Sequence, residues 1–226
     1  MTHFCITRVS ELEKLINNRT YITKLEININ SFEIVIDLQS LEYEEIDLYD
    51  ISNLLKNFTD LQSLEFGDDY DQSTDLSPLV NLTHLKFGTT YNQLTDLSQL
   101  VNLQHLEFGH GYNELTDLSQ LVNLTYLKFG ERYNQPTNLS TLINLRHLEF
   151  GYCYNQQTDL SQLVNLTHLE FGYRYVQPTD FSQLVNLEHL EFRECNGRIN
   201  YEHQTDLRKC VKLDKSLFNK YRFMIL

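Results

Sequence analysis

The sequence predicts an α/β repeat solenoid, with a parallel β-sheet on its concave side and short helical turns on its convex side. Two observations support this fold class. A unit of 21 residues recurs without slippage over residues 61–186, and each unit opens with the apolar spacing of a β-strand. Self-similarity at a fixed period of this length is typical of stacked, quasi-one-dimensional folds. We expect the coil to be right-handed, because crossovers between parallel strands almost always are.

The strict part of the array consists of six copies of the unit. They begin at Leu61, Leu82, Leu103, Leu124, Leu145 and Leu166. One unit cannot bury its apolar side chains alone, whereas stacked units join them into continuous ladders. Each large apolar side chain contributes roughly 1.5–3 kcal/mol when it is fully buried. Stacking is therefore the expected source of stability.

Each unit is expected to begin with a short strand. In the copy that starts at Leu82, the letters LTHLKF place Leu85 and Phe87 on one face and His84 and Lys86 on the other. Side chains alternate in this way along any strand. The apolar face predicts the core, and the polar face predicts an open, concave surface.

Turn residues follow the strand. The glycine at the seventh place of the unit, such as Gly88, is expected to allow a turn that a residue with a Cβ would resist. An aspartate such as Asp96 is expected to cap a short helical turn. The recurring tyrosine and asparagine are expected to fill the interior and to pair with backbone groups of the turn, respectively.

The chain is predicted to be one domain over residues 1–226. Residues 1–60 are expected to hold a helical N-terminal cap and degenerate rungs, and residues 187–226 a divergent last repeat and a C-terminal cap. The letters Ser-Glu-Leu-Glu fit a capping box and predict a helix over residues 10–18. Looser rungs are expected at 22–27, 43–48 and 213–218, which brings the candidate rungs to ten.

The final repeat departs from the unit in length. Residues 187–212 make a copy of 26 residues, which is five longer than the others. Cys210 stands where Leu100 stands in a regular copy, so we expect it to substitute for a core leucine. The apolar tail at 223–226 is expected to pack over the last rung.

Composition narrows the classes of partner. The 31 acidic residues outnumber the 18 basic ones and give a net charge of −13, so no nucleic-acid or membrane partner is expected. No apolar run is long enough for a signal peptide or a membrane span, and we expect a cytoplasmic protein. The cysteines are far apart and form no CxxC pair, which favours free thiols, and no cofactor is expected. They are Cys5, Cys153, Cys195 and Cys210.

The repeat letters also carry a family resemblance. The pattern LxxLxFGxxYNQxTDLSxLVN resembles a leucine-rich repeat, and its FGxxYNQP portion resembles the FNIP repeats of social amoebae and giant amoeba-infecting viruses. The TDLSQLVNL portion is similar to the internalin type. Asp71 and Val176 depart from the pattern, because they replace the asparagine of the eleventh place. The resemblance implies a protein-binding scaffold, located in the host cytoplasm if the chain is viral.

Two sets of side chains are the candidate partner-binding residues. The first projects from the concave sheet at the third place of the unit, with an acidic strip beside it. These residues are His84, His105, Tyr126, His147, His168 and His189, with Glu149, Glu170 and Glu191 as the strip. The second set lies on the rim where the strands end, and consists of Tyr152, Tyr173 and Arg174. They predict a non-enzymatic scaffold for a protein partner, and the acidic strip favours a basic surface on that partner.

Two other interpretations stay open. The histidines and glutamates of the concave ladder could form a metal-binding or metal-dependent site, because nitrogen and carboxylate ligands suit zinc. The chain could instead be a structural or oligomerising element, and the sequence leaves its oligomeric state open. No motif of a known catalytic type is present, so we expect no enzyme. The strip of like charges is expected to raise the pKa of its histidines above about 6.5.

Overall fold

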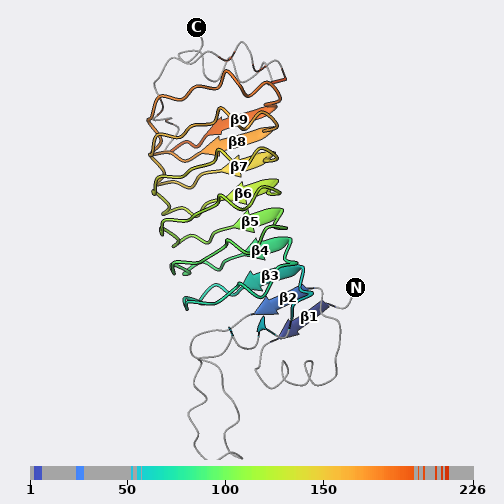
Figure 1. The fold of residues 1–226 in the computed structure, drawn as a ribbon. Helices are drawn as coiled ribbons and strands as arrows, with labels where there is room; N and C mark the ends of the chain where they lie inside the picture. Colours follow the sequence, from blue (N-terminus) through green and yellow to red (C-terminus); the bar gives the residue numbers. More distant parts are fainter. Residues whose placement is uncertain are drawn as a thin grey trace, which may run out of the picture.

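The computed structural model is a stack of coils that share one β-sheet (Figure 1). It describes residues 3–6, 24–27, 52, 55, 56, 58–195, 198, 201, 207, 210, 212 and 213. Over these residues the sheet has nine parallel strands in chain order. They are β1 (His3–Ile6), β2 (Lys24–Ile27), β3 (Ser63–Phe66), β4 (His84–Lys86), β5 (His105–Glu107), β6 (Tyr126–Lys128), β7 (His147–Glu149), β8 (His168–Phe171) and β9 (His189–Phe192). The predicted strand in each strict repeat is confirmed.

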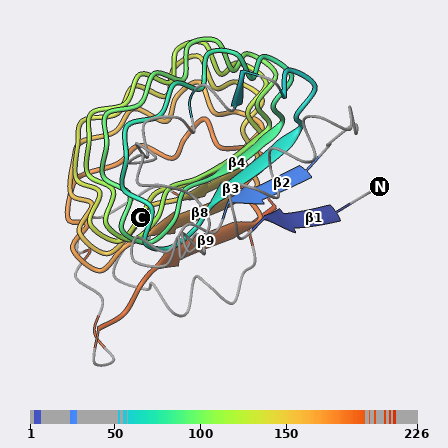
Figure 2. The same cartoon turned by 90° about the horizontal axis from the view of Figure 1, so that it is seen from below.

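The register of the sheet follows the sequence repeat. From β3 to β9 each paired residue lies 21 positions before its partner on the next strand, as Leu85 does before Leu106 and Leu106 before Leu127. Burial alternates along the strands, so the leucines face the core and their neighbours face outward. Figure 2 shows the strands together on one side of the stack and the other segments of each coil on the opposite side.

The core consists of columns of identical side chains. Leucines fill most of it, and each coil adds one phenylalanine and one tyrosine that stack on those of the next coil. Rings of successive phenylalanines are 5.5 Å apart at Phe87 and Phe108, whereas successive tyrosines, farther from the sheet, are 6.3 Å apart at Tyr91 and Tyr112. This wider spacing indicates that the sheet lies on the inner, concave side of a shallow curve.

The side opposite the sheet differs from the prediction. Each coil has two consecutive β-turns there instead of a helical turn, as in the backbone bonds from Leu100 N to Leu97 O and from Leu103 N to Leu100 O, both 3.0 Å. This i to i+3 bonding fits leucines spaced by three residues, and the segment is too short to support an α-helix. Between residues 58 and 195 the structure contains no α-helix, and the described residues form no helix long and apolar enough to cross a membrane.

The aspartate before these turns still has a capping role, because Asp96 Oδ1 accepts a hydrogen bond from the backbone N–H of Ser98 at 2.9 Å. That bond is the largest cause of a lowered pKa of Asp96. The cap therefore serves a β-turn, where the sequence predicted a helical turn.

The repeated glycine also has a different role from the predicted one. A Cβ added to Gly109 would lie 1.7 Å from the carbonyl oxygen of Gly88 in the preceding coil. Gly109 does not adopt the left-handed backbone conformation that favours glycine in turns. The constraint is thus the close approach of two coils, and it recurs at Gly88, Gly130, Gly151 and Gly172.

Polar ladders tie the coils together as predicted. Asn92 Oδ1 accepts a hydrogen bond from the backbone N–H of Asn113 at 2.8 Å, and Asn113 Oδ1 accepts one from Asn134 at the same distance. The buried hydroxyl of Tyr91 is 2.6 Å from Thr95 Oγ1. Burial raises the pKa of Tyr91 to about 12. The asparagines therefore satisfy backbone groups between coils, and the tyrosines fill the interior.

The N-terminal strands only partly match the predicted rungs. Strand β2 confirms the rung at 22–27, but strand β1 was not predicted. Strand β2 pairs directly with β3, so no rung lies between them in the sheet. The predicted rung at 43–48 and the helix at 10–18 lie outside the described residues, as does the tail at 223–226.

The last coil keeps the core pattern despite its insertion. Backbone bonds from Cys210 N to Leu207 O and from Leu213 N to Cys210 O repeat the pair of β-turns. Cys210 is buried, which confirms it as a core substitute. Tyr201 continues the tyrosine column at 5.9 Å from Tyr175. The extra residues therefore lie between Phe192 and Tyr201, and only Leu213 of the predicted rung at 213–218 is described.

Replacing Gly109 with alanine should destabilise the protein by about 1–3 kcal/mol or more, because the new methyl group would overlap the Gly88 backbone. Chemical denaturation of the variant checks this. Gly111→Ala is the matched control, because its Cβ would lie 3.0 Å from the nearest atom and other coils carry larger residues at that place, such as Arg132. Equal stabilities of the two variants would contradict the role assigned to the glycine column.

Candidate partner-binding face

The concave face is the outer surface of the sheet formed by two rows of side chains on β4 to β9. The third place of each unit supplies the first row, which consists of His84, His105, Tyr126, His147, His168 and His189. The fifth place supplies the second row, Lys86, Glu107, Lys128, Glu149, Glu170 and Glu191. Because the sheet is in register, each row runs straight across six neighbouring strands.

The third-place side chains project from the sheet and form one continuous column of stacked rings. The rings are closest around Tyr126, whose centroid is 4.1 Å from that of His105 and 4.4 Å from that of His147. The other successive pairs are 5.4–5.7 Å apart. All six rings are exposed or half-buried. The column is therefore ordered by the sheet but accessible to a partner.

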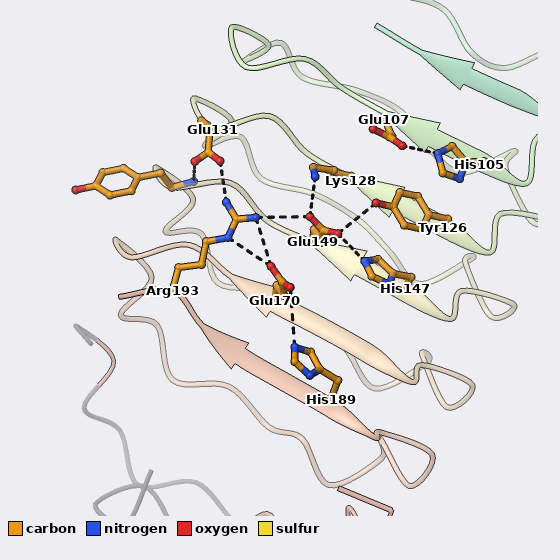
Figure 3. Close-up of polar contacts among 11 residues, drawn as sticks. His105, Glu107, Tyr126, Lys128, Glu131, His147, Glu149, Glu170, His189 and Arg193 are labelled. Atoms are coloured by element: carbon orange, nitrogen blue, oxygen red, sulfur yellow. Dashed lines mark hydrogen bonds and ion pairs between the residues drawn. The ribbon is translucent and has the colours of Figure 1, made fainter. Parts of the chain in front are cut away.

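Glu149 is the most buried carboxylate of the second row, with 11% of its side chain exposed. His147 Nε2 is 2.7 Å from its Oε1, Lys128 Nζ is 3.0 Å from its Oε2, and the Tyr126 hydroxyl donates to Oε1 at 3.2 Å (Figure 3). The hydrogen bond with His147 is the largest cause that lowers the pKa of Glu149, to about 2. Burial and the charge of Glu149 raise the pKa of Tyr126. Glu149 thus joins the ring column to the charged row.

The lysines and glutamates of the second row do not form ion pairs in simple alternation along the row. Lys86 pairs with Glu65 on the preceding strand, and Lys128 pairs with Glu149. Glu107 instead contacts His105, whose Nε2 is 2.6 Å from Glu107 Oε1. Each lysine is therefore paired with one neighbouring carboxylate, and the carboxylate of Glu107 is paired with the imidazole of His105.

Sequence reasoning missed Arg193, which crosses the acidic strip. Its Nη1 is 2.7 Å from Glu131 Oε1, and its Nη2 is 3.3 Å from Glu170 Oε2 and 3.6 Å from Glu149 Oε2 (Figure 3). A signal was available in the sequence, because Arg193 stands at the seventh place, where the strict copies carry glycine, and directly precedes the inserted residues. The sequence predicted a strip of like charges at Glu149, Glu170 and Glu191, whereas the Arg193 guanidinium contacts two of these carboxylates.

The expected rise in histidine pKa is wrong for His168. Burial, followed by the neighbouring His147 and His189, lowers the pKa of this imidazole below its usual value, and these effects outweigh Glu188 and Glu170. The ring centroid of His168 is 5.4 Å from that of His147 and 5.7 Å from that of His189. A protonated imidazole at either neighbour opposes protonation of His168. Burial, together with the neighbouring histidines of the column, therefore outweighs the effect of the carboxylates on the pKa of His168.

The predicted rim residues also come together. The rings of Tyr152 and Tyr173 stack at 5.7 Å, and the Arg174 guanidinium lies 5.5 Å from the centre of the Tyr152 ring. Glu131 links the rim to the concave face, because its Oε2 accepts a hydrogen bond from the Tyr152 backbone N–H at 2.7 Å while its Oε1 contacts Arg193. Face and rim are thus one connected surface.

Comparison with solved structures identifies the fold. The functional domain of InlJ from Listeria monocytogenes, which includes a cysteine ladder, matches with a TM-score of 0.54 and 20% identity over 70% of this chain and 35% of that one. An internalin, InlF, from Listeria monocytogenes matches with a TM-score of 0.51 and 21% identity over 77% of this chain and 55% of that one. This chain folds as a leucine-rich-repeat solenoid. It spans between about a third and just over half of the length of these structures.

The sequence identity to these structures is 20–21%, so the comparisons show the repeat fold and nothing further. No family model and no curated protein sequence matches the chain. The FNIP resemblance, an amoebal or viral origin and a cytoplasmic location therefore stay predictions. Ladders of tyrosine, phenylalanine and asparagine stabilise this leucine-rich-repeat solenoid.

Glu149→Gln should reduce stability at neutral pH, because the variant lacks the charge that His147, Lys128 and Arg193 contact. A carboxylate whose folded pKa is depressed from about 4.5 to about 2 stabilises the protein above the unfolded pKa, and this contribution is lost as pH falls through the folded value. This contribution amounts to about 3 kcal/mol. Denaturation at pH 7 and pH 2 checks whether the deficit shrinks in acid. A variant of the exposed Glu188, Glu188→Gln, is the control, and a deficit that is equal at both pH values would contradict the assignment.

The lowered pKa of His168 should depend on its neighbours in the column. Replacing His147 with glutamine removes one of the charges that oppose protonation of His168, so the pKa of His168 should rise. Glu170→Gln should move it in the opposite direction, because Glu170 favours the protonated ring. NMR titration of His168 in the three proteins measures both shifts. An unchanged His168 in His147→Gln would show that burial alone sets its pKa.

Proposed function

We propose that this leucine-rich-repeat solenoid is a non-enzymatic scaffold that binds a partner protein through its concave face and the adjacent rim. One observation carries the proposal. Six rings in contact, His84 to His189, stand on the side of the sheet that the core does not use, and each is exposed or half-buried. The leucines of the same strands already provide the packing, so the fold does not require aromatic side chains on the other face.

The surface has the chemistry of protein recognition. Tyrosine and arginine are enriched among the residues that dominate binding energy, and the rim presents Tyr152, Tyr173 and Arg174 in mutual contact. Rings held in place by a sheet lose little conformational freedom on binding, which lowers the entropic cost of association. The rigid strands therefore favour a preformed binding surface.

Charge supports a basic group on the partner. The second row together with Glu65, Glu131 and Arg193 holds six carboxylates and three cations. Arg193 shows which geometry suits the strip, since its guanidinium contacts Glu131, Glu149 and Glu170 at once. A basic side chain of a partner would add to this network beside Glu191, at the strand farthest from the two lysines.

Capture from amoebal lysate followed by affinity measurement tests the proposal. Simultaneous replacement of Tyr152, Tyr173 and Arg174 by alanine should weaken a captured protein at least tenfold, because truncating interface anchors commonly costs about 2 kcal/mol or more. The thermal melt should stay close to that of the wild type. A His147→Ala, His168→Ala variant should weaken the same partner.

The matched control lies on the opposite side of the coil. Gln99 and Gln162 are exposed beside the β-turns, so alanine at both should leave the captured protein bound. Binding that is lost equally in this control, or that survives in both concave variants, would place the interaction elsewhere and contradict the proposal.

A further inference from the structure

Three potential metal ligands meet at the C-terminal end of the concave face. Glu170, His189 and Glu191 each offer one ligand atom, and these atoms lie within 4.8 Å of one another. His189 Nε2 is 3.5 Å from Glu191 Oε2 and 3.9 Å from Glu170 Oε1. Within the described part of the chain, no other group of three such side chains comes together in this way.

The fold explains why these side chains converge. His189 and Glu191 are separated by one residue on β9, so they project from the same face of the strand. Glu170 is the registered partner of Glu191 on β8. Two ligands from one strand and a third from its neighbour therefore surround a common point above the sheet.

We propose that Glu170, His189 and Glu191 form a zinc-binding site. Zinc accepts imidazole nitrogen and carboxylate oxygen at about 2.0–2.2 Å in tetrahedral geometry, which sets ligand atoms about 3.4 Å apart. The observed separations of 3.5 and 3.9 Å require only small side-chain rotations to reach it. Calcium and magnesium prefer sites built from oxygen atoms alone, so the imidazole favours a transition metal.

The equivalent positions in earlier coils do not offer the same set. The carboxylate next to His147 is Glu149, and Lys128 Nζ lies 3.0 Å from it. Glu107 beside His105 has lysines at the fifth place of both neighbouring strands. An ammonium group 3.0 Å away competes with a metal ion for the carboxylate, whereas the cation beside Glu170, Arg193, contacts that carboxylate at the longer distance of 3.3 Å and only through Oε2. Strands β7, β8 and β9 all carry glutamate at the fifth place, and the β7–β8 pair differs from the β8–β9 pair because Glu149 on β7 contacts Lys128.

Arg193 orients one of the ligands. Its Nη2 contacts Glu170 Oε2 at 3.3 Å, while the other oxygen of that carboxylate, Oε1, is the one nearest His189 (Figure 3). Carboxylates that bind metals commonly hold such an outer hydrogen-bond partner, which fixes their direction. Arg193, the last residue before the inserted segment, thus positions Glu170.

The site leaves room for a further ligand. The side chains of His189 and Glu191 are 40% and 37% exposed, and both belong to the concave face. A tetrahedral zinc ion takes four ligands, and the protein supplies three of them. The fourth position is therefore available to water or to a donor group that approaches the concave face. Zinc binding does not require the partner proposed above, but a zinc ion and a basic side chain of that partner would compete for Glu191.

Zinc titration of the full chain, without a polyhistidine tag and in competition with a colorimetric zinc chelator, tests the site. We expect one zinc ion per chain, with binding weakened at least tenfold by His189→Gln and by Glu191→Gln. His168→Gln is the matched control, because it removes the same side chain one strand earlier in the ring column and should leave zinc binding unchanged. Circular dichroism verifies that each variant is folded.

Two results would overturn the proposal. Wild-type protein that does not compete with the chelator has no such site. Equal weakening by His168→Gln and His189→Gln would show that zinc associates with the histidine column in general, and no site at Glu170, His189 and Glu191 would then be assigned.

Discussion

Contact between successive coils at the glycine column is the constraint on which the rest of this protein depends. Backbone oxygen of one coil occupies the space that a Cβ of the next would need, at 1.7 Å in the case of Gly88 and Gly109. This approach keeps the backbones close enough for the sheet, the asparagine bonds and the ring stacks to form together. Because all of these ladders share one register, a displacement at any level would break the others as well.

The same register that builds the core also builds the surface. A strand that aligns Leu148 with Leu169 in the interior must align His147 with His168 and Glu149 with Glu170 outside. Like residues therefore face like residues across the concave face, which is unfavourable for carboxylates and for protonated histidines. The protein compensates with Lys128 and Arg193 for Glu149, and with a lowered pKa for His168.

Arg193 shows how the end of the array acquires properties that its middle lacks. At the seventh place an arginine would clash in a regular copy, since each glycine there lies against the preceding coil. The longer path between Phe192 and Tyr201 accompanies this substitution. The departure from the repeat thus places a guanidinium over three glutamates and makes the last two strands chemically distinct from the others.

The sequence by itself determined the strands β2 to β9, their parallel arrangement, the core columns and the rows of His84 to His189 and Glu149 to Glu191. These follow from a repeat of fixed length and from the alternation of side chains along a strand, both of which are local properties. Only the tertiary structure decided the rest. The role of Gly109, the reach of Arg193 to Glu131 and the lowered pKa of His168 all arise from contacts between coils. Such contacts depend on distances between residues 21 or more positions apart, and a one-dimensional pattern does not contain those distances.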